Sequence, residues 1–255
     1  MRFASLGSGS RGNALIVEAA GTRIMVDCGF SARSTVERLQ RLGIDASSID
    51  GVLLTHEHSD HVAGVVRFCA RFDVPVYLTH GTHAALSSRN EEMPACRLID
   101  SHQPMAIGSI EITPFPVPHD AREPVQYLVS DGARRLGVLT DCGAVTPHVL
   151  GVLDGCQALV VECNHDPDLL AASDYPAMLK KRIAGKYGHL SNGEAASLLK
   201  SLDRRHLQHV LAAHLSEENN RPLLAEAALA EVLGCGKGWV GIADQDAGFS
   251  WRQIA

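Results

Sequence analysis

The chain has 255 residues, 45% of them hydrophobic, and a formal net charge of −6. This composition excludes a disordered or low-complexity protein and fits one large core, so we expect a single domain over residues 1–255. The negative charge gives no attraction of the whole molecule to a phosphate backbone, so binding of nucleic acid would need a local basic patch or bound metal. Without a long apolar run or the layout of a signal peptide, a cytoplasmic protein that avoids membranes is expected.

Cysteine and histidine usage narrows the chemistry further. The seven cysteines are scattered without a CxxC pair, which argues against both a disulfide framework and a cysteine-type zinc site. The 13 histidines exceed what a chain of this size usually carries, and imidazole is the commonest side-chain ligand of metal ions. Composition therefore indicates a reduced protein in which histidine does the metal binding.

Short strands alternate with helices along the whole chain. In the first part, apolar runs separated by Gly-rich turns predict strands at 2–6, 14–18, 23–26, 52–55 and 76–78, and helical spacing predicts helices at 34–42 and 61–72. The middle predicts strands at 107–117, 126–130 and 134–140. The second half predicts strands at 158–162, 209–213, 238–242 and 248–252, with helices at 174–183, 192–202 and 221–233. This mixed order favours a layered α/β or α+β fold.

Four potential metal ligands follow one buried strand within six positions: His56, His58, Asp60 and His61. Neighbours at i and i+2 point apart on a helix, so an irregular loop must present them. In such a loop the first two side chains face one metal ion and the last two turn towards a second. Such a cluster at a strand end predicts a metal site.

The segment His56-Glu57-His58-Ser59-Asp60-His61 resembles the HxHxDH motif of the metallo-β-lactamase superfamily at every specified position. The resemblance implies a four-layer αββα sandwich. It also implies that His56, His58 and His119 hold one divalent ion, that Asp60, His61 and His214 hold another, and that Asp141 bridges them. The earlier Asp27, in an Asp-x-Gly turn, is implied to support the site rather than bind metal.

Two ions in such a site share a hydroxide for hydrolysis, and this ligand set suits Zn²⁺ or Mn²⁺. The resemblance to the nuclease branch of the superfamily implies that Glu162 and His189 stand beside the metals as an acid relay. In that relay the carboxylate orients the imidazole and raises its pKa, and Asp60 also serves catalysis.

The most detailed resemblance is to the YycJ/WalJ-like group, which lacks a β-CASP insertion. It is carried by Ser5 to Asn13, Glu162 to Asp166, Gly188 to Asn192 and His214 to Pro222. It implies a 5′→3′ exonuclease acting on DNA with a nucleic acid or other phosphodiester as partner, and the sequence specifies no oligomeric state.

Five further residues of these motifs are expected to contact the substrate: Ser8, Ser10 and Asn13 in the first, and Ser191 and Asn192 in the third. Simpler interpretations stay open, since the first motif fits a plain hairpin turn and Ser191 or Asn192 is a natural helix N-cap. A positive rim built from Arg11, Lys180, Lys181, Lys186 or Arg221 would favour nucleic acid, although these basic residues also fit a solvated surface.

Two other functions remain open at this stage. One is an acyl hydrolase of the same fold, such as a thioesterase or lactonase, which uses the same hydroxide on an acyl carbon. The other is a non-catalytic binding module whose metals only hold the fold together.

Overall fold

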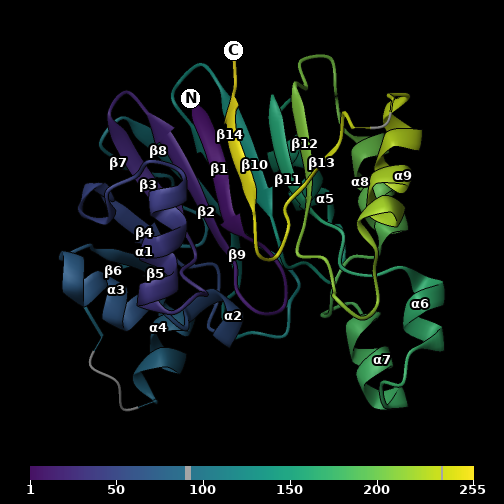
Figure 1. Cartoon of the computed structure of the whole chain (residues 1–255), viewed down its shortest axis with the longest axis horizontal. Coiled ribbons are helices and arrows are strands. Elements are labelled where there is room, and N and C mark those ends of the chain that lie inside the picture. Colours follow the sequence, from purple (N-terminus) through teal and green to yellow (C-terminus); the bar gives the residue numbers. More distant parts are fainter. Residues whose placement is uncertain (90–92, 237) are drawn as a thin grey trace.

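The computed structural model describes residues 1–89, 93–236 and 238–255 of the chain. Its strands form two seven-stranded sheets that pack face to face, with helices on both outer faces (Figure 1). This is the four-layer α/β sandwich predicted from the sequence. The core between the sheets draws on both of them, with Phe3 and Val17 from the first and Ile112, Val129 and Val160 from the second.

The first sheet has the order β14-β1-β2-β3-β4-β5-β6. Its strands are β1 (Arg2–Gly7), β2 (Ala14–Ala19), β3 (Thr22–Val26), β4 (Gly51–Leu53), β5 (Val76–Thr79), β6 (Cys96–Ile99) and β14 (Phe249–Gln253). Side chains alternate between the two faces of a strand. In β2, Leu15 and Val17 therefore enter the core between the sheets, while Ala14 and Ile16 face the helices outside.

The second sheet has the order β13-β12-β11-β10-β9-β8-β7. Its strands are β7 (Met105–Ile107), β8 (Ile110–Pro116), β9 (Val125–Ser130), β10 (Arg135–Leu139), β11 (Ala158–Glu162), β12 (His209–Ala213) and β13 (Gly241–Ile242). From β10 to β13 the strands run parallel, so their carboxyl ends lie at one edge of the sheet. Ligands of α/β proteins bind at such edges.

Helices cover the outer face of each sheet. On the first sheet lie α1 (Ala32–Arg41), the 3₁₀ turn η1 (Ala46–Ser48), α2 (Ser59–Val62), α3 (Val65–Phe72) and α4 (His80–Ser87). On the second sheet lie α5 (Pro147–Leu153), α8 (Asn192–Ser201) and α9 (Pro222–Leu233), while α6 (Pro167–Ala172) and α7 (Ala177–Ile183) project beyond the end of that sheet (Figure 1). Leu39 and Phe68 bury against the first sheet, and Leu198 and Leu229 against the second. Within the described residues, no helix combines the length and apolar character needed to cross a membrane.

The structure differs from the sequence prediction in several elements. The helix predicted over 61–72 is two helices, because the Gly64 N–H donates to Cys28 O at 2.9 Å instead of continuing the first helix. The strand predicted over 107–117 is a hairpin of β7 and β8, in which Ile107 pairs with Ile110. Helices α4, α5 and α6 and strand β6 were not predicted at all. None of these differences moves a proposed site residue away from its strand end.

Candidate metal centre

The loop after β4 lies between two other loops that fix its path. Asn13 N donates to Asp60 O at 2.8 Å, and Cys28 N donates to His61 O at 2.9 Å. The turn after β3 approaches so closely that a Cβ atom on Gly29 would lie 1.7 Å from Asp60 O. Only glycine fits there, so the Asp-Cys-Gly turn sets the position of the loop.

Three histidines gather at one end of this loop, since the possible ligand atoms of His56, His58 and His119 all lie within 4.8 Å of one another. His119 Nδ1 lies 3.0 Å from Gly188 O, and His58 Nε2 lies 3.2 Å from Asp120 O. A carbonyl oxygen only accepts, so both of these nitrogens carry the proton. The other two ring nitrogens, His119 Nε2 and His58 Nδ1, are left with lone pairs 3.3 Å apart.

His56 completes this group with a ring nitrogen that has no partner. Thr55 Oγ1 donates to the Asp27 carboxylate and accepts from His56 Nδ1, 3.0 Å away. His56 Nε2 is buried without a hydrogen-bond partner among the described residues. Burial and the nearby His61 hold the pKa of His56 well below its usual range, so the ring is neutral.

Lone pairs that face one another in a buried site call for a cation between them. Tetrahedral bonds of 2.0–2.1 Å to zinc place neighbouring nitrogen ligands about 3.3–3.4 Å apart. The spacing of 3.3 Å between His119 Nε2 and His58 Nδ1 agrees with this geometry. The donor set therefore fits a divalent metal ion.

A second group consists of Asp60, His61 and His214. Asp60 Oδ2 lies 3.2 Å from His61 Nε2 and 3.2 Å from His214 Nε2. His61 uses its other nitrogen, Nδ1, to donate to Asp27 Oδ2 at 2.8 Å, which orients the ring. Burial alone would lower the pKa of His61, but the carboxylates of Asp60 and Asp141 outweigh it and hold that pKa well above its usual range. The negative charge concentrated here suits a second cation.

Asp141 lies between the two groups. Its carboxylate oxygens lie 3.1 Å from His61 Nε2, 3.4 Å from His214 Nδ1 and 3.8 Å from His119 Nε2. Oδ2 is buried without hydrogen-bond geometry to any described residue, although His61 Nε2 is close. Burial would raise the pKa of Asp141, but His214 and His61 hold it well below its usual range. The carboxylate therefore contacts histidines of both groups.

Beside this cluster, Glu162 accepts four hydrogen bonds. Oε1 accepts from His189 Nδ1 at 2.7 Å and from His214 Nδ1 at 3.2 Å. Oε2 accepts from the backbone N–H groups of Cys142 and Leu190, at 2.9 and 3.1 Å. Glu162 thus orients a predicted metal ligand as well as the predicted acid, a connection that the sequence did not reveal. Burial would lower the pKa of His189, but Glu162 raises it above its usual range.

The comparisons with known proteins agree with this arrangement. Residues 22–214 match a family described as a beta-lactamase superfamily domain, which is most of the chain. The chain belongs to the beta-lactamase superfamily. Within it, the chain falls in the YycJ/WalJ-like group: it is 34% identical to the exodeoxyribonuclease YycJ of Bacillus anthracis, over 91% of this chain and 89% of that protein.

A second relative is the exodeoxyribonuclease WalJ of Streptococcus pneumoniae, 29% identical over 91% of this chain and 88% of that protein. The crystal structure of the metallo-beta-lactamase fold protein YhfI from Bacillus subtilis covers 98% of both chains with a TM-score of 0.76 at 17% identity. The beta-lactamase superfamily fold is one that holds divalent metal ions. The buried, unpartnered atoms His56 Nε2 and Asp141 Oδ2 show that the residues of this member fit such ions.

The candidate metal ligands of this beta-lactamase superfamily member lie at a cavity of about 190 Å³. Besides His58, Asp60, Asp141, His189 and His214, its walls contain Ser10, Asn164, Tyr175, Ile183, Ser216 and Asn219. Asn164, Ser216 and Asn219 lie in motifs that the sequence analysis quoted, but no role was assigned to them there. The sequence feature that could have indicated them is a run of polar residues directly after a strand, and a strand also precedes the candidate ligands.

Of the five residues expected to contact substrate, only Ser10 lies on the cavity wall. Ser8 Oγ donates to Asn13 Oδ1 at 2.9 Å and accepts from His214 N at 2.9 Å. It therefore supports the backbone of the candidate ligand His214. Asn13 Nδ2 lies 3.2 Å from both Asp60 Oδ2 and His61 Nε2. Backbone N–H groups of this first loop are also engaged inside the chain, as in the Gly9 N donation to Asn13 Oδ1.

The last two of the five lie at the start of α8. Ser191 is the N-cap, and with Glu194 it forms a capping box. Asn192 Nδ2 donates to Asn220 Oδ1 at 2.9 Å. Both side chains are buried and hold the loop that carries His189.

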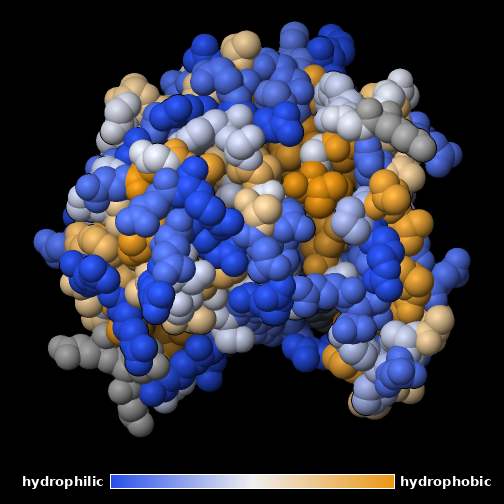
Figure 2. All heavy atoms as spheres, in the orientation of Figure 1, coloured by the Kyte–Doolittle hydropathy of each residue, from blue (hydrophilic) through white to orange (hydrophobic). Residues whose placement is uncertain are grey.

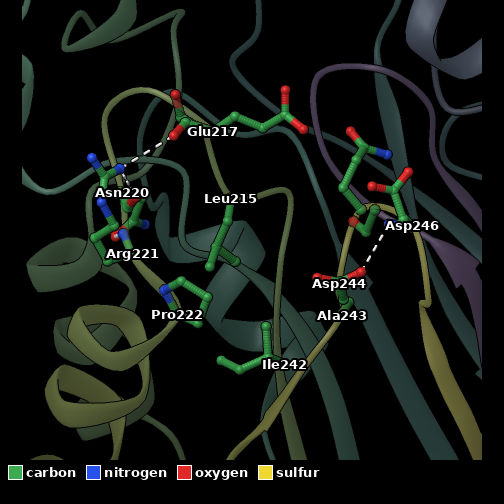
Figure 3. A pocket seen from close by; sticks show the side chains of 12 residues that line it. Leu215, Glu217, Asn220, Arg221, Pro222, Ile242, Ala243, Asp244 and Asp246 are labelled. Carbon is green, nitrogen blue, oxygen red and sulfur yellow. Dashed lines mark hydrogen bonds between the residues drawn. The ribbon is translucent and has the colours of Figure 1, made fainter.

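A second, larger cavity of about 320 Å³ adjoins the metal cavity and shares Ser216 with it. Figure 3 shows Leu215, Pro222 and Ile242 along this groove, with acidic side chains around it. Three of the lining residues are acidic: Glu217, Asp244 and Asp246. Arg221 also lines this groove, and Arg11 pairs with Glu217 and Asp246, so the groove carries charges of both signs.

Proposed function

We propose that this chain is a metal-dependent phosphodiesterase that acts as a 5′→3′ exonuclease on DNA. The observation that carries the proposal is the Glu162–His189 pair, whose histidine stands at the wall of a cavity that also contains candidate metal ligands. The relatives named as exodeoxyribonucleases cover most of their own length in the comparison and support the same substrate.

We propose a ligand set of two divalent ions, Zn²⁺ or Mn²⁺. His56, His58 and His119 would hold one, Asp60, His61 and His214 the other, and Asp141 would bridge them. When bound, such ions supply Lewis-acid activation of a water molecule and neutralise charge on the phosphate. Because β4 belongs to the first sheet and β8, β10 and β12 to the second, the ligands require both sheets, and we treat residues 1–255 as one domain.

The chain's own residues supply the proton that a departing oxygen needs. His189 donates from Nδ1 to Glu162, which directs Nε2–H towards the cavity. The Glu162 carboxylate raises the pKa of His189 and so favours the protonated ring that a general acid requires. Asp60, besides its place as a ligand, lies on the cavity wall, where it accepts protons or orients water.

Polar groups of the cavity bind the phosphate. Ser10, Ser216 and Asn164 offer hydroxyl and amide donors next to the metal ligands. The Oδ1 atom of Asn219 is buried without a partner among the described residues, which leaves an acceptor for a sugar hydroxyl or base N–H group. We place this activity in the cytoplasm, where the seven free thiols stay reduced.

The test uses metal-loaded protein with 5′-labelled and 3′-labelled DNA, single-stranded and duplex, together with bis-p-nitrophenyl phosphate. We expect stepwise release of nucleotides from the 5′ end and a loss of about 10²-fold or more in kcat with His189→Ala. Intact DNA and intact diester would refute the proposal. Turnover of an acyl-thioester that His189→Ala leaves unchanged would instead favour an acyl hydrolase.

A further inference from the structure

Two different surfaces flank the metal cavity. On one side, α6, α7 and the turn that follows, residues 167–187, form what we call the α7 lobe, which projects beyond the sandwich (Figure 1). It carries Lys180, Lys181, Arg182 and Lys186. On the other side lies the groove of Figure 3. Figure 2 shows the lower edge of the molecule hollowed between the lobe and the side that carries α2 and α4.

The two arginines nearest to this groove are engaged within the chain. Arg11 Nη2 lies 2.6 Å from Glu217 Oε1 and 3.0 Å from Asp246 Oδ2. The Arg221 guanidinium is turned towards backbone carbonyl groups, including Asn220 O at 2.5 Å. Arg11 is therefore paired with carboxylates, whereas Arg221 keeps its charge but is held at its own loop by these carbonyl contacts. The α7 lobe, in contrast, carries four basic residues within seven positions.

Hydrogen bonds connect the lobe to the loop that carries His119. Asp120 N donates to Tyr187 O at 3.0 Å, and Arg182 Nε donates to Asp120 Oδ2 at 2.5 Å. These contacts use the backbone of Tyr187 and leave its side chain 65% exposed. The backbone of Tyr187 therefore lies beside the loop that carries His119, and its side chain is free to contact a ligand.

The lobe also touches the loop that carries Asp141. A Cβ atom on Gly143 would lie 2.4 Å from Lys186 O, so glycine allows the two backbones to meet. Among the described residues, no carboxylate lies within 4.0 Å of the Lys181 or Lys186 ammonium groups, unlike the paired Arg182. Two unpaired lysines thus lie on the lobe, one of them directly beside the site.

The lobe also carries aromatic side chains. Tyr175 lines the metal cavity, Tyr187 is exposed on the rim, and Met178, 81% exposed, lies between them in the sequence. Exposed rings next to unpaired cations are the combination that binds single-stranded nucleic acid, because bases stack on the rings while phosphates contact the cations.

We infer that the α7 lobe holds the DNA strand under hydrolysis in an unpaired state, with bases stacked on Tyr187 and Tyr175 and phosphates on Lys181 and Lys186. This inference rests on the proposed function. The cavity of about 190 Å³ at the candidate metal ligands is small, which favours a single strand over a duplex. The lobe therefore sets the path along which the strand enters.

The stacking contact is tested with metal-loaded protein and a fluorescent phosphorothioate oligothymidine of about twelve nucleotides, which resists hydrolysis and matches known single-strand site sizes. By fluorescence anisotropy, we expect Tyr187→Ala to weaken binding about tenfold and Tyr187→Phe to keep most of the affinity. Both variants keep the backbone carbonyl that Asp120 N contacts. Equal affinity of all three proteins would overturn the stacking contact.

The phosphate contacts are tested by the dependence of binding on salt. Each phosphate contact to a single strand contributes about 0.7 to the slope of log K against log salt, so Lys181→Ala with Lys186→Ala should lower the slope by about 1.4. Lys200→Ala is the matched control, because this exposed lysine lies at the end of α8 away from Ser191. An unchanged slope in the double variant, or an equal change in the control, would overturn the contacts.

Two outcomes separate this inference from the proposed function. If the wild-type protein hydrolyses neither DNA nor bis-p-nitrophenyl phosphate, the proposed function fails, whatever the binding data show. If it degrades DNA while the lobe variants bind the oligonucleotide like wild type, only the lobe assignment fails. Preference for a blunt duplex over the single strand, with lobe variants that bind both normally, would also overturn it.

Discussion

The Oε1 atom of Glu162 lies 2.7 Å from Nδ1 of His189. The same oxygen lies 3.2 Å from His214 Nδ1, so one carboxylate orients both the predicted acid and a predicted metal ligand. Glu162 is fully buried and has no path to the substrate. It is therefore a positioning residue, whose removal affects two processes at once.

Glu162→Gln keeps the size of the side chain and removes its charge. We expect kcat on DNA to fall about 10²-fold, and metal affinity to fall about 10-fold to 100-fold, because outer carboxylates orient ligating histidines. The pKa of His189 should fall when its negative partner is lost, so the alkaline limb of the pH–rate profile moves to lower pH. Kinetics at saturating metal separate the two effects, and a profile that keeps its wild-type position would contradict the role.

Asp27→Asn tests whether the Asp27 carboxylate orients His61, a candidate ligand of the second metal ion. Asp27 contacts His61 Nδ1 at 2.8 Å, and only through Thr55 does it reach His56. We expect the site of Asp60, His61 and His214 to lose about 10-fold to 100-fold in affinity. At limiting metal, bound metal per chain should fall from about two towards about one.

Metal content is measured after equilibration with a buffered metal supply. Asp168→Asn, a change on the exposed surface of α6, serves as the control and should bind metal like wild type. An Asp27→Asn protein with full metal content at limiting metal would show that the carboxylate is dispensable.

Gly29→Ala tests the contact between the turn after β3 and the metal loop. The new Cβ would lie 1.7 Å from Asp60 O, so one of the two backbones must move. We expect a loss of about 3 kcal/mol in the free energy of unfolding, together with weaker metal binding. Urea unfolding checks the first and metal titration the second.

Gly151→Ala is the matched control, because a Cβ there meets nothing within 4 Å and Gly151 lies inside α5. Alanine in a helix interior should stabilise the protein by about 0.5–1 kcal/mol. A Gly29→Ala protein as stable as wild type would mean that the loops adjust without cost.

Asp131→Asn tests a charge cluster far from the metals. Asp131 accepts from Arg134 N at 2.8 Å and lies 3.3 Å from the Met1 ammonium group. Although partial burial opposes it, hydrogen bonds from the Arg134 and Ala133 amides lower its pKa to about 2. A lowered carboxyl pKa stabilises the fold above the unfolded pKa, and this contribution disappears as pH falls towards 2.

At pH 7 we therefore expect Asp131→Asn to unfold with about 1–2 kcal/mol less free energy than wild type, a value reduced for solvent screening. The difference should shrink between about pH 4 and pH 2. Urea unfolding of both proteins in chelator removes the contribution of metal. A difference that stays constant over this range would contradict the charge effect.

Much of the candidate site was predictable because each residue follows a strand. His56 to His61 stand together in the sequence. His119, Asp141 and His214 follow the ends of β8, β10 and β12 by three, two and one residues. The residues themselves indicated only the cluster at 56–61, and the family resemblance supplied the other three, which the fold brings close because they follow strand ends. The position of Ser8 was not predictable, because its partner His214 lies 206 residues away.

The missed helices have a different cause. α5 and α6 are short, with 7 and 6 residues, and neither shows a clear helical repeat of apolar positions. Their start signals were nevertheless present, because Thr146-Pro147 and Asp166-Pro167 each combine an N-cap side chain with proline at the first helical position. Strand β6 was missed because half of its residues are exposed and its alternation is weak.

The placement of β14 beside β1 determines when the first sheet can be completed during synthesis. β1 lies between β2 and β14, with Phe3 opposite Arg252 and Ser5 opposite Phe249, so one edge of the starting strand stays open during synthesis. On the ribosome, the first sheet therefore remains incomplete until Phe249–Gln253 has emerged. We expect nascent chains stalled before this strand to be sensitive to protease and poor at retaining metal, since their first ligand loop would sit on an unfinished sheet.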